Sequence, residues 1–600
     1  MTQLMSATQL YAQSQNQGHS PAPSSEPFEA KKTSALDALI EEYEGAVQEF
    51  DSLWSAKPTA TSLGDASNDR VLAAAALDQE YLNRLDELEI TSVSLQDQIT
   101  ADIFRRQLDK RAGEIPHRGH YLPLNGWWDY HATFAELPTR TRFRSQKDME
   151  EYLDKLRDWP QYSRQYIDRL EKGRQEGWVR PRIVFDKYLP TISSHVVDTP
   201  EESRFFEQVS GFPDKAPEEL KRRVSEEALL DFRNQVFALV RDSVLTGFSE
   251  LVRYLEETYI PSSSPEPGIG SLEGGEDYYQ WLIGYYTTLE LTADEIHQIG
   301  LREVTEIRSA MMEIVREEGY GEDFDAYVNH LRTDPQYYAE TPEELMEKTA
   351  LVLKRMDGEL PKLFKTLPRQ PYGIKPIPDY LAPQTTTAYY SGGNLDTEAG
   401  FYAVNTYDLP SRPLYEVESL SLHEAVPGHH LQIALHKELH ESSDWPAVRT
   451  RASFTAYTEG WALYSERLGE EVGFYRSPSS RFGRLSYDMW RALRLVVDTG
   501  LHTKGWTRKE AIDFMASNSA LSLRNIENEV DRYIFWPGQA LGYKLGEIEI
   551  RNLRQKAETE LGADFDVREF HEVVLGSGNI PLNMLQKLVE EWITERAERE

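Results

Sequence analysis

Cysteine is absent from the 600-residue sequence. This absence excludes disulfide bonds, thiolate metal ligands and a cysteine nucleophile. Any transition-metal site must therefore be built from His, Asp and Glu side chains. Such ligands favour zinc, manganese or iron over copper(I).

Long apolar runs are also lacking, because no stretch approaches the roughly 20 apolar residues that a membrane-spanning helix needs. Residues 1–34 are rich in Gln, Ser, Ala and Pro, and they lack the basic region and apolar core of a secretory signal. This composition predicts a disordered tail. We therefore expect a cytoplasmic protein that does not contact a membrane.

Positive charge is scarce, since 65 Lys and Arg residues stand against 100 Asp and Glu residues, for a formal net charge of −35. A protein that binds nucleic acid needs a basic surface to neutralise phosphate groups. The charge balance therefore argues against a nucleic-acid partner. It is more typical of a soluble protein whose positive potential is confined to a cleft.

Most of the remaining sequence has helical periodicity, with apolar residues at intervals of three and four between charged ones. The clearest segments are 36–54, 78–109, 147–176 and 217–259. This pattern predicts a mainly α fold in which residues 35–600 form one helical domain. A Ser-, Pro- and Gly-rich loop near residues 260–275 could separate two lobes.

A small β element is predicted between the helical segments. Residues 388–390 and, after a Gly-Gly-Asn turn, residues 400–406 have the aromatic and β-branched composition of strands. An edge strand at this place could bind an extended peptide through backbone hydrogen bonds.

The most informative stretch reads Ser-Leu-His-Glu-Ala-Val-Pro-Gly-His-His-Leu-Gln. It places His423 and Glu424 ahead of the pair His429 and His430, which are the residue types of a catalytic zinc site. In the common zinc-binding helix the two histidines are four residues apart. Here Pro427 occupies that fourth position, and proline neither binds metal nor fits a helix interior.

The spacing decides which histidine pairs with His423. On a regular helix His430 would lie about 10 Å further along the axis, too far for one zinc ion with bonds near ~2.1 Å. His429 would point roughly 120° away, which a two-residue bulge at Pro427 and Gly428 would correct. We therefore favour His429 as a ligand, with His430 as the fallback or a substrate-facing residue. The alternative is a buried, hydrogen-bonded histidine pair beside a Pro-Gly turn.

A third ligand is expected from the segment Glu-Gly-Trp-Ala-Leu-Tyr-Ser-Glu. Its two acids, Glu459 and Glu466, are seven residues apart and share one helix face. Gly460 allows another helix to approach closely, which favours Glu459 as the ligand. Glu466 is then expected to orient a histidine from behind. The alternative is that these are surface acids of an acidic protein.

Two later segments could complete a site. Arg494, Asp498 and His502 recur at four-residue intervals, which offers either a structural ion-pair network or substrate contacts. Tyr533 and Tyr543 are phenols that could stabilise the oxyanion of a tetrahedral intermediate. Spacing alone does not choose between them.

Together these motifs resemble the bacterial family catalogued as domain of unknown function 885, over the chain from about residue 36 to the C-terminus. The motifs are Gly-Ser-Leu-x-Gly-Gly-Glu-x-Tyr-Tyr at 270–279, His-Glu-Ala-x-Pro-Gly-His-His-Leu-Gln at 423–432, Glu-Gly-Trp-Ala-Leu-Tyr at 459–464 and Pro-Gly-Gln-Ala at 537–540. That family is similar in turn to the helical zincins, which include oligopeptidases and carboxypeptidases of the angiotensin-converting-enzyme type. The sequence departs from the zincins in its longer spacing between His-Glu and the next histidine.

The resemblance implies a large helical zincin-like fold with a small β element beside the active-site helix and a deep central cleft. It also implies one Zn²⁺ per chain, and we assign His423, His429 and Glu459 as its ligands. Glu424 is then the general base.

The downstream residues follow from the same resemblance. Zincins of this type carry an Arg-Tyr dipeptide whose tyrosine supports the transition state, and Arg532 with Tyr533 matches it. Tyr533 is therefore predicted to be catalytic. Substrate contacts are predicted for the strand around Asn405 and for His430, Arg532 and Tyr543.

The predicted function is zinc-dependent hydrolysis of peptide bonds in short peptides. A metal-dependent amidohydrolase or carboxypeptidase acting on modified small amides would use the same site. A non-catalytic helical scaffold with structural histidines is the remaining alternative.

Overall fold

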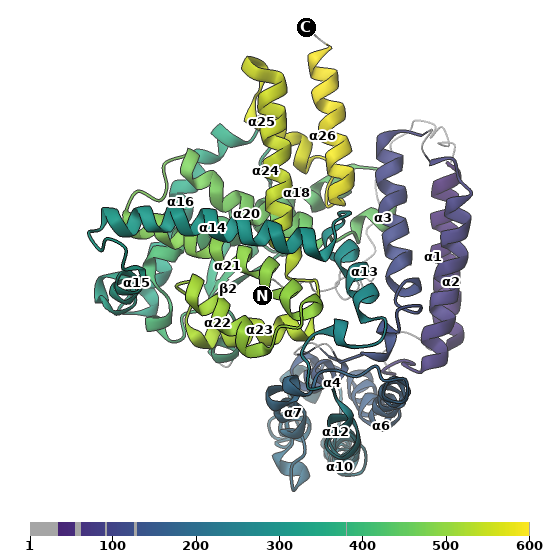
Figure 1. Cartoon of the computed structure of the whole chain (residues 1–600). Coiled ribbons are helices and arrows are strands. Elements are labelled where there is room, and N and C mark those ends of the chain that lie inside the picture. Colours follow the sequence, from purple (N-terminus) through teal and green to yellow (C-terminus); the bar gives the residue numbers. More distant parts are fainter. Residues whose placement is uncertain are drawn as a thin grey trace.

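A computed structural model describes residues 34–54, 62–90, 93–124, 126, 129–379 and 381–598 of the chain. The predicted disordered tail, residues 1–34, lies outside these residues except for Ser34. The mainly α class predicted from the sequence is confirmed, because helices make up most of the described residues (Figure 1).

The first half of the chain consists of helices of very different lengths. They are α1 (Ala35–Trp54), α2 (Asn68–Asp86), α3 (Leu95–Ala112), α4 (Tyr130–Ala135), α5 (Leu137–Arg140), α6 (Gln146–Gln175), α7 (Phe185–Ser193), α8 (Arg204–Glu207), α9 (Glu218–Lys221), α10 (Glu226–Leu239), α11 (Leu245–Tyr254), α12 (Ile260–Ser262), α13 (Gly275–Thr287) and α14 (Ala293–Glu317). Two π-helical turns, Val240–Val244 and Leu255–Tyr259, join α10, α11 and α12. The single helix expected over 78–109 is instead the end of α2 and most of α3.

The second half contains the three strands and the longer central helices. Its helices are α15 (Phe324–Thr333), α16 (Pro342–Leu363), α17 (Val417–Glu424), α18 (His429–Ser442), α19 (Ala447–Thr450), α20 (Thr455–Glu471), α21 (Pro478–Thr503), α22 (Arg508–Asn518), α23 (Leu523–Phe535), α24 (Leu541–Leu561), α25 (Val567–Leu575) and α26 (Leu582–Ala597). Its strands are β1 (Tyr372–Pro376), β2 (Ala388–Ser391) and β3 (Gly400–Val404).

The three strands form one sheet in the order β1-β3-β2. β2 and β3 pair in antiparallel fashion, as the predicted turn between them requires, whereas β1 pairs with β3 in parallel and was not predicted. Because β3 is the central strand, its backbone is already paired on both sides. The strand leading to Asn405 is therefore not a sheet edge, whereas β2, the other predicted strand, is one. That an edge strand of this element binds a peptide stays a prediction.

The loop expected near residues 260–275 contains α12 and a 3-10 turn, Ile269–Ser271. This turn contacts the end of α21, where the backbone N–H of Ile269 donates to Nδ1 of His502 over 3.1 Å. A division of the chain into two lobes at this loop stays a prediction.

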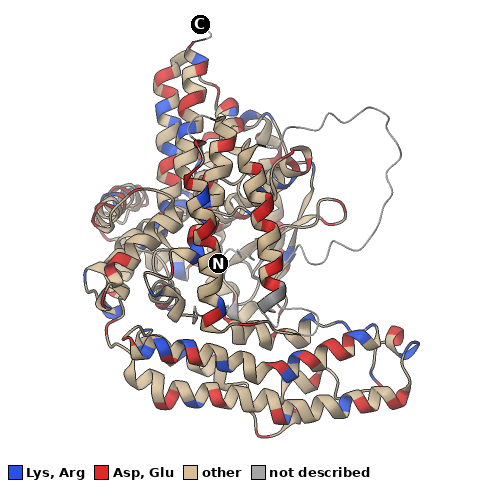
Figure 2. Ribbon diagram, turned by 90° about the vertical axis from the view of Figure 1, so that its right-hand side faces the viewer, with Lys and Arg blue, Asp and Glu red and all other residues tan. Residues whose placement is uncertain are grey.

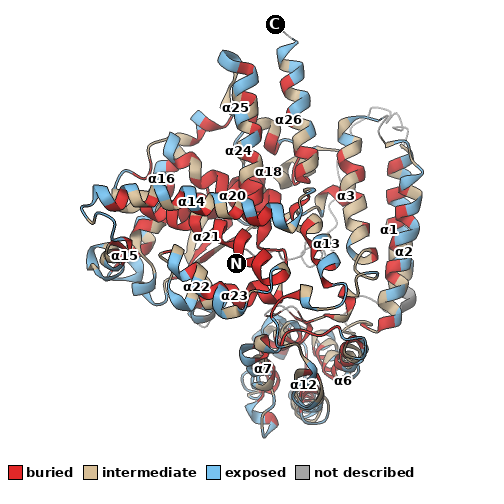
Figure 3. Cartoon of the chain, in the orientation of Figure 1, coloured by how far each residue is buried: buried red, intermediate tan, exposed pale blue. Residues whose placement is uncertain are grey.

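Buried residues are concentrated in the central helices. In Figure 3, α20 and α21 are buried along most of their length, whereas α1, α2, α25 and α26 expose their outer faces. Helix α20 packs on α24, and α14 packs on α21. The segments that carry the sequence motifs therefore form the middle of the molecule.

Two glycines bring α20 and α24 into backbone contact. A Cβ atom on Gly460 would lie 2.5 Å from the carbonyl carbon of Gly546, and one on Gly546 would lie 1.9 Å from the oxygen of Ala456. Neither position can hold a side chain without moving a helix. The expectation that Gly460 allows close approach of another helix is confirmed, and this contact fixes Glu459 beside α24.

Charged residues of both signs alternate along the outer helices (Figure 2). Within the described residues, no helix combines the length and the apolar character that a membrane crossing requires.

Candidate metal centre

The His-Glu…His-His segment folds as two helices that meet at a turn. Helix α17 ends at Glu424, and α18 begins at His429. The turn contains a cis Val426–Pro427 peptide bond, and the N–H of Gly428 donates to the carbonyl of Leu422 over 2.9 Å. A Cβ atom on Gly428 would lie only 1.9 Å from the carbonyl oxygen of His423, so this turn requires glycine. The predicted bulge within one helix is thus a complete break between two helices.

This break brings His423 and His429 together. Their ring centroids are 4.8 Å apart and the rings are nearly perpendicular. Helix α20 adds Glu459, whose Oε2 lies 3.5 Å from Nε2 of His423 and 3.6 Å from Nε2 of His429. All three residues are buried, and each offers a ligand atom within 4.8 Å of the other two.

The chemistry of this group fits a metal ion. Among the described residues, neither ring nitrogen of His429 has a hydrogen-bond partner, although the side chain is 0% exposed. A buried polar atom normally has a partner, because leaving it unpaired costs roughly 1–3 kcal/mol. Two imidazole nitrogens and one carboxylate oxygen form a ligand set that zinc prefers. The buried group of His423, His429 and Glu459 could therefore hold a metal ion.

Glu466 orients the first histidine from behind. Nδ1 of His423 lies 2.8 Å from Oε1 of Glu466, and the hydroxyl of Ser419 donates to Oε2 of Glu466 over 2.6 Å. A proton held on Nδ1 leaves Nε2 of His423 facing Glu459 with its lone pair. The predicted role of Glu466 is confirmed, whereas the contribution of Ser419 was missed because serine on its own carries no spacing signal.

Burial and charge set the protonation of these groups. Burial lowers the pKa of His429 to about 3, which keeps this imidazole neutral. Burial also opposes the charged form of His423, but hydrogen bonds to Glu459 and Glu466 outweigh it and raise the pKa to about 9. This imidazole would give up its proton on binding a metal ion. Burial raises the pKa of Glu424, so its carboxylate takes up a proton more readily than an exposed one.

His430 points away from this group. Its Nδ1 lies 2.9 Å from the hydroxyl of Tyr390 on β2, and its ring lies 4.8 Å from the ring of Tyr372 on β1. His430, the fallback ligand, therefore packs between α18 and the sheet. The structure brings His423 together with His429 and not with His430.

The Asn405 side chain has a structural role. Its side-chain NH₂ donates to the carbonyls of Ala382, Thr385 and Thr386 at 2.9 to 3.0 Å, and its Oδ1 accepts from the N–H of Tyr407. These bonds occupy both ends of the amide. The side chain therefore holds the loop before β2 and has no donor left for a substrate.

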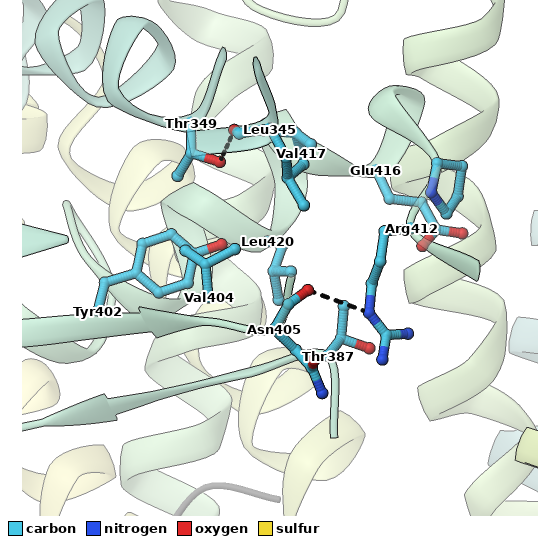
Figure 4. Close-up of a pocket in the computed structure, with 11 residues that line it drawn as sticks. Leu345, Thr349, Thr387, Tyr402, Val404, Asn405, Arg412, Glu416, Val417 and Leu420 are labelled. Carbon is cyan, nitrogen blue, oxygen red and sulfur yellow. Dashed lines mark hydrogen bonds between the residues drawn. The ribbon is translucent and has the colours of Figure 1, made fainter. Parts of the chain in front are cut away.

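A small cavity lies beside the start of α17 (Figure 4). Its lining includes Tyr402, Asn405, Arg412, Glu416 and Leu420. The cavity has a volume of about 20 Å³, which is room for one water molecule and not for a peptide. It is therefore not the deep cleft implied by the resemblance, and that cleft stays a prediction.

Tyr533 belongs to a buried ionic cluster on α21 and α23. Its hydroxyl donates to Oε2 of Glu529 over 2.8 Å and accepts from Nε of Arg494 at 3.3 Å. Arg532, the other half of the predicted Arg-Tyr dipeptide, bonds to Glu529 at 3.2 Å and to Gln539. The proton of Tyr533 is thus directed at Glu529.

Tyr543 is linked to the metal group through Glu459. It is on α24, one turn before the contact of Gly546 with Gly460. Burial raises the pKa of Tyr543, and the neighbouring Glu459 carboxylate raises it further. Sequence spacing could not rank the two phenols, because the contact between α20 and α24 that selects Tyr543 joins segments about 80 residues apart.

Asp498 and His502 do not form a continuous ion-pair network with Arg494 along α21. Asp498 accepts from the hydroxyl of Tyr279 at 2.5 Å and from the N–H of Gly538 at 3.0 Å. Nε2 of His502 lies 3.0 Å from the carbonyl of Tyr533. These residues tie α21 to its neighbours, which favours the structural alternative.

A family model described as "Bacterial protein of unknown function (DUF885)" matches residues 50–589. The chain belongs to the DUF885 family. No curated protein matches this DUF885 chain.

Solved structures match the same fold. A crystal structure described as the "putative lipoprotein from Colwellia psychrerythraea" has a TM-score of 0.81 and 26% identity, covering 94% of this chain and 100% of that one. A "putative lipoprotein of unknown function from Shewanella oneidensis" has a TM-score of 0.72 and 16% identity, covering 93% of this chain and 100% of that one. An M32 carboxypeptidase from Deinococcus radiodurans R1 has a TM-score of 0.34 and 12% identity, covering 94% of this chain and 99% of that one. A TM-score this low supports no inference.

These descriptions correct one prediction. A lipoprotein is held at a membrane by its lipid. The Colwellia psychrerythraea structure, 26% identical over 94% of this DUF885 chain, is described in that way. The cytoplasmic location predicted from the sequence is therefore wrong.

Proposed function

We propose that this DUF885 protein hydrolyses peptide bonds in short peptides, with one zinc ion bound by His423, His429 and Glu459. The observation that carries the proposal is the convergence of these three buried side chains, with both nitrogens of His429 unpaired within the described part of the chain. A structural histidine pair would be hydrogen-bonded instead. Zinc in such a site supplies a Lewis acid that activates water and polarises a carbonyl group.

Glu424 is the proposed general base. It follows His423 at the end of α17, and its Oε2 has no hydrogen-bond partner among the described residues. Its raised pKa suits a group that takes up a proton and then releases it. Oε2 of Glu424 accepts a proton from the attacking water and returns it to the leaving amine nitrogen.

Tyr543, rather than Tyr533, is the proposed donor to the oxyanion. Support comes from the electrostatic coupling of Tyr543 to Glu459 and from the hydrogen bond that commits the Tyr533 proton to Glu529. A neutral phenol with a raised pKa keeps its proton for donation. Tyr533 then holds Glu529 and Arg494 in place.

The first test is metal content and peptide cleavage by the purified protein. We expect about one zinc per chain by elemental analysis and release of amines from short unmodified peptides, both lost after treatment with a chelator and restored by added zinc. Cleavage of acylated amino acids but not of peptides would favour the small-amide alternative. Absence of bound zinc after zinc addition would overturn the proposal in favour of a scaffold.

A further inference from the structure

Two buried arginines share one carboxylate beside the metal group. Arg494 on α21 and Arg532 on α23 bond to Oε2 of Glu529 at 3.0 and 3.2 Å. All three residues are less than a tenth exposed. Two guanidinium charges and one carboxylate leave an excess of one positive charge in this cluster.

Part of the hydrogen-bonding capacity of the arginines is unused. Within the described residues, Nη1 of Arg494 and Nε of Arg532 have no hydrogen-bond partner. Arginine presents its donors in a planar fork that matches a carboxylate. A buried cation without a full set of partners is costly, so an anion that reaches these atoms would be bound tightly.

Aromatic rings fix the position of the cluster relative to the metal group. The guanidinium carbon of Arg494 lies 4.8 Å from the ring centroid of Trp490 and 4.2 Å from that of Tyr543. The guanidinium carbon of Arg532 lies 5.7 Å from the ring centroid of Tyr543. Tyr543 is three residues before Gly546, which contacts Gly460 next to Glu459. Tyr543 also interacts electrostatically with Glu459, so its ring links the arginines to the metal ligand.

Another acid that interacts with the cluster does not neutralise this excess. Asp498 interacts electrostatically with Arg532, but its Oδ1 is bonded to Tyr279 and Gly538. Burial raises the pKa of Asp498 to about 7, so this carboxyl group is only partly charged at neutral pH. The cluster of Arg494, Arg532 and Glu529 therefore keeps its excess of positive charge.

We propose that Arg494 and Arg532 bind the free C-terminal carboxylate of the substrate, which restricts the enzyme to removing residues from the C-terminal end of short peptides. This inference rests on the proposed function and names its substrate class. Because the Tyr543 ring contacts both arginines and Tyr543 neighbours Glu459 through the contact of α24 with α20, a carboxylate on the arginines would leave a bond close to the C-terminus at the metal group. In the reaction, water gives its hydroxyl to the acyl carbon, the C–N bond breaks, and the amine nitrogen takes the remaining proton.

The sharpest test needs no mutation. The wild-type protein loaded with zinc is given one peptide as the free acid and as the C-terminal amide, and products are identified by mass spectrometry. We expect kcat/KM for the amide to be lower by about 10²-fold or more, because the arginines then lose their charged partner. Equal rates, or cleavage from the N-terminal end, would overturn the inference and leave the proposed function standing. Failure to cleave either peptide would instead count against the proposed function.

A binding measurement tests the arginines without relying on turnover. Calorimetry compares N-acetyl-leucine with N-acetyl-leucinamide on the wild type, Arg494→Lys and the control Arg508→Lys. Arg508, on α22, pairs with Asp531, the residue before Arg532 on α23. Neither Arg508 nor Asp531 belongs to the cluster of Arg494, Arg532 and Glu529. We expect the acid to bind the wild type and the control at least about tenfold more tightly than the amide, and Arg494→Lys to lose this preference because lysine cannot present two parallel donors.

Two results of the binding measurement would overturn the inference. One is an unchanged preference for the acid in a folded Arg494→Lys protein. The other is full suppression of acid binding by millimolar chloride, which would make the cluster a site for a small inorganic anion. If Arg494→Lys does not fold, the inference is decided by the wild-type protein alone, from its kcat/KM on the free-acid peptide and on the C-terminal amide.

Discussion

Two buried polar clusters lie close together in this protein, and they differ in one respect. Lys544 on α24 is 0% exposed and contacts three carboxylates, Asp488 at 2.5 Å and Glu303 and Glu547 at 3.0 Å. His423, His429 and Glu459 are all more deeply buried than Asp488 and Glu303, and their cluster contains no lysine or arginine. The first cluster supplies its own cation, whereas the second leaves the nitrogens of His429 without hydrogen bonds in the described structure.

The difference shows how a ligand site can be told from structural ionic packing. Buried charges persist when partners compensate them, as the three acids around Lys544 do. A buried group that lacks such compensation indicates that something from outside completes it. The following predictions test this distinction, from the largest expected effect to the smallest.

Replacing Glu424 with glutamine should abolish turnover while leaving the metal in place. We expect kcat on a short peptide to fall by about 10²–10⁴-fold, because the amide cannot accept a proton. Zinc content, measured by elemental analysis, should stay near the wild-type value. Glu418→Gln on the same helix is the control, since Glu418 pairs with Arg355 and accepts from the N–H of Tyr475 and is not part of the metal group. Full activity of Glu424→Gln would show that another group is the base.

Removing one histidine should empty the site, whereas removing its neighbour should not. We expect His429→Ala to lose zinc affinity by more than about 10²-fold, since it removes a ligand rather than a supporting residue. His430→Ala should keep zinc, because His430 contacts Tyr390 and Tyr372 instead. Competition with a zinc chelator measures both affinities. The reverse result would restore His430 as the ligand.

Replacing Lys544 should lower the stability of the protein and leave its zinc binding unchanged. Lys544→Met removes the buried cation from Asp488, Glu303 and Glu547, which keep the more distant Arg484 and Arg551 as partners. We expect the free energy of unfolding to fall by about 3–5 kcal/mol in urea titrations. Lys556→Met is the matched control, because its ion pair with Glu590 is exposed and contributes about 1 kcal/mol or less. A folded Lys544→Met protein that loses zinc but not stability would contradict the distinction between the two clusters.

The residue behind His423 should have the mildest effect. Glu466→Gln keeps the shape of the side chain but weakens its hold on Nδ1 of His423, and we expect zinc affinity to fall about 10–100-fold. Glu471→Gln on the same helix is the control, since Glu471 bonds to Arg554 near the surface. Equal zinc affinities of Glu466→Gln and Glu471→Gln would show that Glu466 does not support metal binding.

Local sequence patterns predicted several helices and the convergence of three candidate ligands. The helical periodicity over 147–176 corresponds to α6, and the segment 36–54 corresponds to α1. His423, His429 and Glu459 could be proposed because Pro427 and Gly428 mark a local break in the helix. The form of that break could not be predicted, since it depends on a backbone hydrogen bond between Gly428 and Leu422.

Contacts between distant segments were harder to predict. The short strand β1 pairs with β3 across 28 residues, and it gave no alternating pattern long enough to mark it. Tyr543 was placed second to Tyr533 because the resemblance favoured the Arg-Tyr dipeptide. Our proposal reverses that order because α24 packs on α20 and because Tyr533 donates its hydrogen bond to Glu529.

The contact of Gly460 with Gly546 has a consequence for motion. Because the backbones of α20 and α24 touch there, neither helix can slide without displacing the other. Glu459, Glu466, Tyr543 and Lys544 should therefore open as one cooperative unit, so the central amides of both helices should exchange their hydrogens with similar protection. Substrate entry would then depend on movement of the surrounding helices, while the reacting groups keep their spacing.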